Sequence, residues 1–330
     1  MSKRVMSLEL VKLLAALSVV ATHVGHFSEL PPEWSVNIRL LFRWAVPFFF
    51  IVSGYFLQRN GSVVERAPKF LVRILILFVL ASCLYAPLVV WDRGWDGLSR
   101  ILSMKVLYIG TWFHLWYLSS LIIGVAVIYS VKRLGWDDLF LPLSCIILVA
   151  CVSTDFCMVC RIDTPITFNM TKYLLSIPFL YIGMVLSRYD VYSMKLYYTV
   201  LFVLVGIGFQ YAEAYYALQH YSSDAIRHQF LVVTIPFAVG MFLFGLNGFI
   251  QKVLFFSISP QYSLHIYILH PLFLYFLEKY VHSSMFLFLV ALLLLFPTIA
   301  VYRACTVFMH HILIRQASQM TTSSSALPPV

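Results

Sequence analysis

Residues 9–26 of this chain read Glu9-Leu-Val-Lys12-Leu-Leu-Ala-Ala-Leu-Ser-Val-Val-Ala-Thr-His23-Val-Gly-His26. The segment is apolar and long enough to cross a bilayer as a helix, yet it carries Glu9, Lys12 and His23. At ~100° per residue, the step from Lys12 to His23 leaves these side chains only about 20° apart around the helix. Because ionisable groups at membrane depth usually face a bundle interior, we predict one polar stripe along this span. At ~1.5 Å per residue, Lys12 and His23 stand roughly 16 Å apart, which suits two ends of one long substrate.

The whole chain has the composition of a membrane protein. Of its 330 residues, 61% are hydrophobic and 11% are charged, and the mean hydropathy is +0.88. Soluble domains carry about 25% charged residues. We therefore predict an all-α integral membrane protein, because an open sheet edge cannot be satisfied in lipid. Its transmembrane domain is expected over residues 1–315, followed by a polar, disordered cytoplasmic tail over residues 316–330.

Ten apolar segments qualify as membrane-spanning helices. They are residues 8–26, 38–57, 70–90, 114–131, 139–155, 172–187, 195–213, 229–247, 262–277 and 284–305. With the N-terminus in the cytoplasm, 13 Lys and Arg side chains fall on the cytoplasmic side and 9 on the outer side. This excess favours both termini inside. The net charge of +9 therefore fits membrane topology, and we expect membrane lipids rather than nucleic acid as surroundings.

The second span carries an arginine and a small-residue pair. Arg43 falls near the depth of His23, because this span descends from the outer side. It is either an arginine that reaches to the outer interface or a charge that orients the histidine or an acceptor. Ser53-Gly54 lets another backbone approach closely, and such pairs more often serve packing than a site.

A basic face begins the third span. Arg66, Lys69 and Arg73 are spaced for one side of a helix at its cytoplasmic end. A helix N-terminus with a basic face is a natural phosphate site. Anchoring by positive charges on the cytoplasmic side explains Arg66 and Lys69 equally well, but explains Arg73 less well, because apolar residues surround it.

Histidines appear in two later spans. His114 opens the fourth span, where it is either an interface residue or a site residue. His265 and His270 are about 140° apart around the ninth helix, so they are not expected to share a metal ion. His270 precedes Pro271 and is a polar packing residue beside a kink or a supporting site residue. We predict no metal site, and Cys157 and Cys160 form either a disulfide or two incidental thiols.

The first span resembles the signature of the acyltransferase-3 family of integral membrane acyltransferases. In that signature an acid and a basic residue precede a histidine, as Glu9, Lys12 and His23 do here. The chain has Glu9 where aspartate is usual and Lys12 where arginine is commoner. A lysine keeps the charge but loses the bidentate fork of arginine.

Four further segments carry the same resemblance in the right order along the chain. They are Val-Pro-Phe-Phe-Phe-Ile-Val-Ser-Gly-Tyr at 46–55, Arg73, His-Leu-Trp-Tyr-Leu at 114–118 and Ser-Leu-His-Ile-Tyr-Ile-Leu-His-Pro at 263–271. The chain is similar to the short O-acetyltransferases of bacterial surface polysaccharides such as O-antigen. The resemblance implies transfer of an acetyl group from cytoplasmic acetyl-CoA to a sugar hydroxyl of a lipid-linked glycan, in the bacterial inner membrane.

This resemblance gives roles to the polar residues. Arg73, with Lys12 and Lys69, would hold the CoA phosphates. His23 would act as general base on the acceptor hydroxyl, because its ordinary pKa is near neutrality. Glu9 would hold Lys12 in place.

Two questions remain open at the level of sequence. Arg43 or His114 would stabilise the oxyanion, and an acetyl-histidine relay is an alternative to general-base catalysis. A transporter or flippase for a glycan or anionic solute also uses charges within the membrane. Dependence on acetyl-CoA separates an enzyme from a transporter.

Overall fold

The computed structural model describes residues 6–25, 27, 29–59, 61–104, 106–221, 228–247 and 261–324. All regular elements in these ranges are helices. In chain order they are α1 (Met6–His23), α2 (Pro32–Leu41), η1 (Phe42–Trp44), α3 (Ala45–Arg59), α4 (Val63–Leu102), α5 (Val106–Ile109), η2 (Phe113–Leu115), α6 (Trp116–Leu134), η3 (Asp137–Leu139), α7 (Phe140–Val159), α8 (Phe168–Thr171), η4 (Lys172–Leu174), α9 (Ser176–Leu186), η5 (Val191–Ser193), α10 (Leu196–Tyr221), α11 (Thr234–Leu246), α13 (Gln261–Leu277) and α14 (Ser284–Ser324).

Seven helical stretches in the described part of the chain are long and apolar enough to cross a membrane. They are Met6–His23, Pro32–Arg59, Val63–Leu102, Phe113–Leu134, Asp137–Val159, Leu196–His220 and Ser284–Thr306. The other three expected spans coincide with the shorter helices α9, α11 and α13. The all-helical, multi-pass class is therefore confirmed, whereas the count of ten spans and the side of the membrane that each terminus faces stay predictions.

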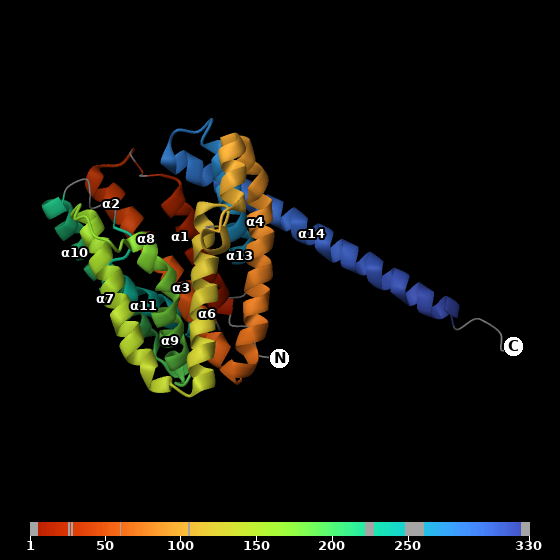
Figure 1. The fold of residues 1–330 in the computed structure, drawn as a ribbon, viewed down its shortest axis with the longest axis horizontal. Coiled ribbons are helices and arrows are strands. Elements are labelled where there is room, and N and C mark those ends of the chain that lie inside the picture. Colours follow the sequence, from red (N-terminus) through yellow and green to blue (C-terminus); the bar gives the residue numbers. More distant parts are fainter. Residues whose placement is uncertain are drawn as a thin grey trace.

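The short helices α9 and α11 pack among longer helices. Helix α9 contacts α3, α6 and α7, and α11 contacts α1, α3 and α10 (Figure 1). The long stretches themselves differ in burial: 61% of the most apolar part of Pro32–Arg59 is buried, against 22% of that of Leu196–His220. A helix shorter than the bilayer leaves irregular backbone at its ends, which is tolerated where protein covers it.

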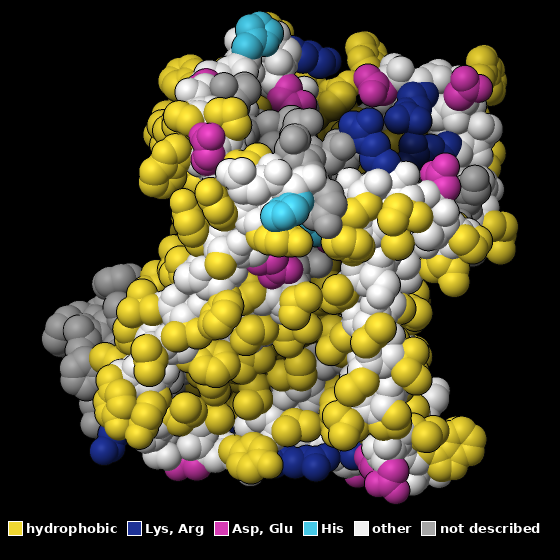
Figure 2. All heavy atoms as spheres, turned by 90° about the vertical axis from the view of Figure 1, so that its left-hand side faces the viewer, with side chains coloured by type: hydrophobic (Ala, Val, Ile, Leu, Met, Phe, Trp, Pro, Cys, Tyr) yellow, Lys and Arg dark blue, Asp and Glu magenta, His cyan; other side chains and the backbone are white. Residues whose placement is uncertain are grey.

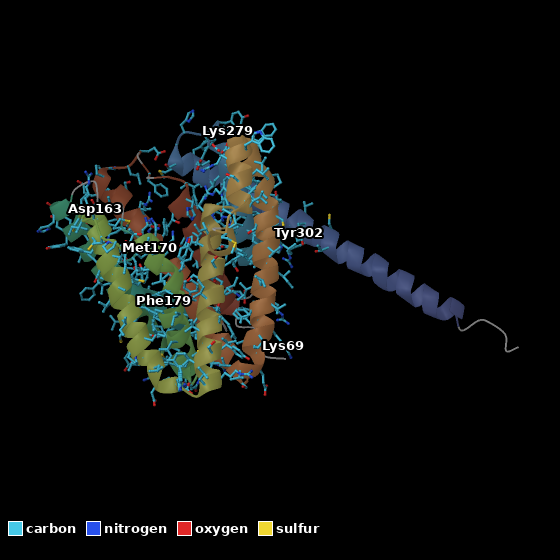
Figure 3. All side chains as sticks on the ribbon, in the orientation of Figure 1. Lys69, Asp163, Met170, Phe179, Lys279 and Tyr302 are labelled. Carbon is cyan, nitrogen blue, oxygen red and sulfur yellow. The ribbon has the colours of Figure 1, made fainter. Side chains whose placement is uncertain are left out.

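The surface is divided as a membrane protein requires. Hydrophobic side chains cover the middle of the face in Figure 2, and most charged side chains lie toward its two ends. In Figure 3, Lys69 lies at one end of the bundle and Asp163 and Lys279 lie at the other. With the N-terminus in the cytoplasm, the sequence predicts the cytoplasmic side for Lys69 and the outer side for Asp163 and Lys279.

Helix α14 extends away from the bundle (Figure 1) and continues as far as Ser324, where the sequence led us to expect a disordered tail from residue 316. Between Pro297 and Ser324 the sequence has neither proline nor glycine to end the helix. The boundary at residue 315 stays a prediction, and residues 325–330 lie outside the described residues.

The loop after α1 fixes where that helix ends. Gly25 has a positive φ of 108°, a conformation that suits glycine, and a Cβ there would lie 2.9 Å from the Ser284 hydroxyl oxygen. The Ser284 amide donates to the Glu29 carboxylate. Hydrogen bonds from its own backbone amide and from Ser283 hold the pKa of the Glu29 carboxyl below its ordinary value. Helix α1 is thereby tied to the start of α14, with His23 as its last residue.

Helices α3 and α9 cross at two glycines. A Cβ at Gly54 would overlap the Leu180 carbonyl oxygen, and one at Gly183 would overlap the Ile51 carbonyl oxygen. Such close approach of backbones is the usual role of small residues in membrane helices. Gly54 therefore serves packing, the reading that the sequence favoured.

We predict that Gly54→Ala and Gly183→Ala each lower the thermal unfolding temperature of the purified protein in detergent. Each added methyl group forces two backbones apart, and overpacking costs about 1–3 kcal/mol. Gly208→Ala is the matched control, because a Cβ there meets no atom within 4 Å. An equal loss of stability in the control would show that the crossing has no special role.

Candidate active site

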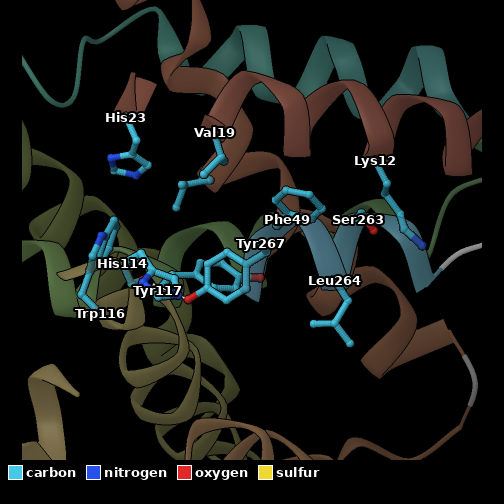
Figure 4. Close-up of a pocket in the computed structure, with 11 residues that line it drawn as sticks. Lys12, Val19, His23, Phe49, His114, Trp116, Tyr117, Ser263, Leu264 and Tyr267 are labelled. Atoms are coloured by element: carbon cyan, nitrogen blue, oxygen red, sulfur yellow. Dashed lines mark hydrogen bonds between the residues drawn. The ribbon is translucent and has the colours of Figure 1, made fainter. Parts of the chain in front are cut away.

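A central cavity of about 240 Å³ runs along the polar stripe of α1. Lys12 and His23 project from the same side of α1 and lie toward opposite ends of the cavity (Figure 4). Helices α3, α6 and α13 and the turn η2 complete its wall, with Phe49, Tyr117 and Tyr267 among the lining residues. The structure thus brings the two ends of the predicted stripe into one elongated space.

Lys12 is held by its neighbour on α1. Its Nζ donates to Glu9 Oε1 at 2.7 Å, and both side chains are largely buried. This is the contact expected of Glu9. Lys12 does not share a cavity with Lys69 and Arg73, with which the sequence had grouped it.

Three histidines from three parts of the chain cluster at the far end of the central cavity. The His23 and His270 rings stack with centroids 5.4 Å apart, and the His114 ring meets His270 edge-on at 5.7 Å. His270 Nδ1 lies 2.9 Å from the Ile266 carbonyl oxygen, so this nitrogen carries the proton and Nε2 is left as an acceptor. His270 is therefore a member of the site and fixes one face of His23.

Pro271 lies inside α13, directly after His270. Proline has no amide hydrogen, so one helical hydrogen bond of α13 is missing. Two side chains bond backbone carbonyls of this part of the helix: His270 bonds that of Ile266, and the Tyr85 hydroxyl donates to that of Ile268 at 2.5 Å. His265 lies on the other side of α13, 5.2 Å from the Tyr302 ring.

His114 is buried with both ring nitrogens unused. Neither Nδ1 nor Nε2 has a hydrogen-bond partner among the described residues, and the side chain lines the central cavity. The Tyr267 hydroxyl donates to the His114 backbone carbonyl at 2.9 Å and so fixes the turn η2. A neutral imidazole always carries one N–H, so His114 offers a free donor inside the cavity.

A second space, which we call the Arg43 cavity, adjoins the first. It measures about 260 Å³ and includes Arg43, Asn169 and Lys172 in its wall. His23 and Trp116 line both cavities. His23 therefore stands in the wall between two spaces, one reaching to Lys12 and the other to Arg43.

The basic face of α4 forms a third space at the opposite end of the bundle, which we call the basic cavity. It measures about 600 Å³ and contains Arg66, Lys69 and Arg73, with Glu65 as its acid. Ser53 of α3 also lines it, and its hydroxyl donates to the Phe49 carbonyl at 2.9 Å.

Phe49 lines the central cavity one helical turn from Ser53. Tyr117 lies in the same wall. The basic and central cavities are thus neighbours along α3.

The structure adds a buried acid that the sequence did not single out. Asp155 is 1% exposed, and its carboxylate accepts from His228 Nδ1 at 2.7 Å and from the Gln229 amide at 2.8 Å. Gln229 and the adjacent Phe230 line the Arg43 cavity. The only sequence signal was an acid at the end of an apolar run, and its partners lie more than 70 residues away.

No group of three His, Cys, Asp or Glu side chains in the described part of the chain is placed to hold a metal ion. Cys157 and Cys160 are free thiols.

Comparison with known proteins gives a family for this arrangement. A family model described as an acyltransferase domain, that of acyltransferase family 3, matches residues 6–306. An amino-acid racemase of Enterococcus faecalis is 28% identical over 293 residues, which are 82% of this chain and 41% of that protein. A serine/alanine racemase of Enterococcus gallinarum is 32% identical over 140 residues, 38% of this chain and 20% of that protein. The chain thus aligns with less than half the length of these relatives, and no solved structure matches significantly.

We predict that Asp155→Ala destabilises the fold and that Asp155→Asn does so less. Alanine leaves the His228 ring and the Gln229 amide without an acceptor, which costs about 1–3 kcal/mol for each buried group. Asparagine keeps one acceptor oxygen. Thermal unfolding of the purified variants measures the order of their stabilities. As a control, Asp163→Ala, at an exposed position, should leave the unfolding temperature unchanged. Equal effects at Asp155 and Asp163 would contradict it.

Proposed function

This chain belongs to the acyltransferase-3 family, and we propose that it moves an acetyl group from cytoplasmic acetyl-CoA to a sugar hydroxyl. Family membership makes it an acyltransferase that acts on hydroxyl groups. The proposal adds the donor, acetyl-CoA, and the acceptor, a lipid-linked surface glycan such as an O-antigen precursor. It also places the multi-pass chain in the bacterial inner membrane.

The observation that carries the proposal is the position of His23 between two cavities. A transferase must bring a donor and an acceptor to one reacting point from different directions. The central cavity reaches His23 from the side of Lys12, and the Arg43 cavity reaches it from another side. A histidine at this junction can serve both substrates.

The charges and the order of the cavities support binding of acetyl-CoA in the basic and central cavities. Arg66, Lys69 and Arg73 offer three cations to the phosphates of CoA, and charge-assisted hydrogen bonds to phosphate are strong. The basic cavity adjoins the central cavity near Ser53. The pantetheine arm then follows the mainly apolar central cavity toward His23, passing Lys12.

At the junction His23 acts as the general base. It takes the proton of the acceptor hydroxyl as that oxygen bonds to the acetyl carbonyl carbon. The carbon–sulfur bond of the thioester then breaks, and the proton passes to the sulfur of CoA. Stacking on His270 limits the orientations open to the His23 ring. An acetyl-histidine relay would use the same two cavities, with His23 attacking the thioester first.

We assign stabilisation of the oxyanion that forms during transfer to His114 rather than to Arg43. His114 lines the central cavity, through which the thioester arrives, and has an unused N–H. Arg43 lines the other cavity. A donor held close to the developing charge is the arrangement that oxyanion stabilisation requires.

The region that this chain shares with the Enterococcus faecalis racemase is 41% of that protein's length. In this chain the acyltransferase domain covers residues 6–306. The proposal is therefore one of acyl transfer.

The direct test is mass spectrometry of the host's surface polysaccharide with the gene intact, deleted, or carrying His23→Ala. We expect acetyl-sized mass on the glycan with the intact gene only. His282→Ala, at an exposed histidine outside the cavities, should keep the modification. Acetylation that survives His23→Ala would refute this mechanism. Unchanged glycan mass with an altered amount of surface glycan would favour a transporter or flippase.

A second prediction concerns donor binding. Lys69→Gln and Arg73→Gln should each raise the KM for acetyl-CoA at least about tenfold with little change in kcat, because a charge-assisted hydrogen bond contributes roughly 1.5–3 kcal/mol. Steady-state assays with purified enzyme measure both constants. Lys195→Gln, at an exposed position outside the basic cavity, is the control. An unchanged KM in both cavity variants would contradict binding of acetyl-CoA in the basic cavity.

A further inference from the structure

The Arg43 cavity contains a cation that forms no ion pair with the described residues. Arg43 lines it, and the Nε and Nη2 atoms of its guanidinium have no hydrogen-bond partner among the described residues. These two nitrogens form one edge of the guanidinium, the edge that matches two oxygens of a carboxylate or phosphate. A buried charge without a partner is costly. The arrangement therefore calls for an anionic ligand.

A second cation lines the same cavity. Lys172, from η4, donates to Asn169 Oδ1 at 2.9 Å, and its Nζ lies 5.4 Å from the centre of the Trp116 ring. An ammonium has three donors, so the bond to Asn169 leaves two for a ligand. Arg43 and Lys172 thus approach one small space from two different elements.

The nearby acid does not balance these charges. Asp155 is the acid that acts on the Arg43 charge, and its single negative charge stands against the two positive charges of Arg43 and Lys172. Arg39 adds a further positive charge close to Arg43. The electrostatic potential inside the Arg43 cavity is therefore positive.

We propose that the acceptor carries an oxyanion, a carboxylate or a phosphate, which Arg43 and Lys172 hold in the Arg43 cavity while its hydroxyl meets His23. This inference rests on the proposed function and names the class of its acceptor. Arg43 Nε and Nη2 are closed off from solvent in this structure.

The volume of the Arg43 cavity limits the size of the group that binds there. About 260 Å³ lies just below the roughly 300–1,000 Å³ of pockets for drug-sized ligands, so one small unit of a longer glycan fits. Trp116 provides an aromatic wall with a polar edge beside that unit. An acidic sugar, or a sugar beside its phosphate, has the required hydroxyl and charge.

The experiment compares three glycosides that differ only at carbon 6: methyl glucoside, methyl glucuronide and methyl glucoside 6-phosphate. Isothermal titration of the purified full chain at fixed ionic strength gives their dissociation constants without acetyl-CoA. We expect at least one anionic glycoside to bind about tenfold or more tighter than the neutral one. The stronger of the two anions identifies the source of the charge, a sugar carboxylate or a phosphate.

Matched variants assign the preference to the cavity. Arg43→Gln and Lys172→Gln should remove most of the preference, and Arg43→Lys should retain part of it. Lys279→Gln, an exposed cation at the same end of the bundle, should retain all of it. Thermal unfolding of each variant shows that it is folded.

The result that overturns the inference is the absence of a difference among the three glycosides, or a preference that survives Arg43→Gln. Acetyl transfer to the neutral glycoside in that case leaves the proposed function standing. Conversely, an Arg43-dependent preference without any acetyl transfer supports the anionic site and counts against the proposed function.

Discussion

Ionisable side chains within a membrane are tolerated where protein, rather than lipid, surrounds them. Helix α1 carries three such groups, and the bundle is built so that one side of α1 faces an internal cavity. Lys12 is neutralised by Glu9 at one end, and His23 is surrounded by aromatic rings at the other. Helix α1 contacts α3 and α13, which also line this cavity.

The enclosure explains why the helices differ in length. The short helices α9 and α11 pack among longer helices, whereas the long apolar helices α4, α7 and α10 are largely exposed. The irregular turns η2 and η4 precede α6 and α9 and lie beside the candidate site. His114 and Lys172 are carried on these turns.

The spacing of Lys12 and His23 predicted their common face, because helical geometry is local and regular. The close approach at Gly54 was also open to prediction, since small residues have few other roles in such helices. The stacking of His270 on His23, the partners of Asp155 and the position of Lys172 beside the Arg43 cavity were not, because each depends on contacts between distant segments, although the sequence had offered His270 as a supporting site residue. Lys12 and Arg73 were grouped by charge alone, and the structure separates them into adjacent cavities.

The central claim is that the donor enters from the end of the basic cavity and meets the acceptor at His23 from the opposite side. Sealed vesicles containing the reconstituted protein test it most directly, with labelled acetyl-CoA outside and lipid-linked glycan from host membranes in the inner leaflet. The account predicts acetylation of the enclosed glycan without passage of acetyl-CoA into the lumen. Transfer that occurs only when both substrates share one side would contradict it.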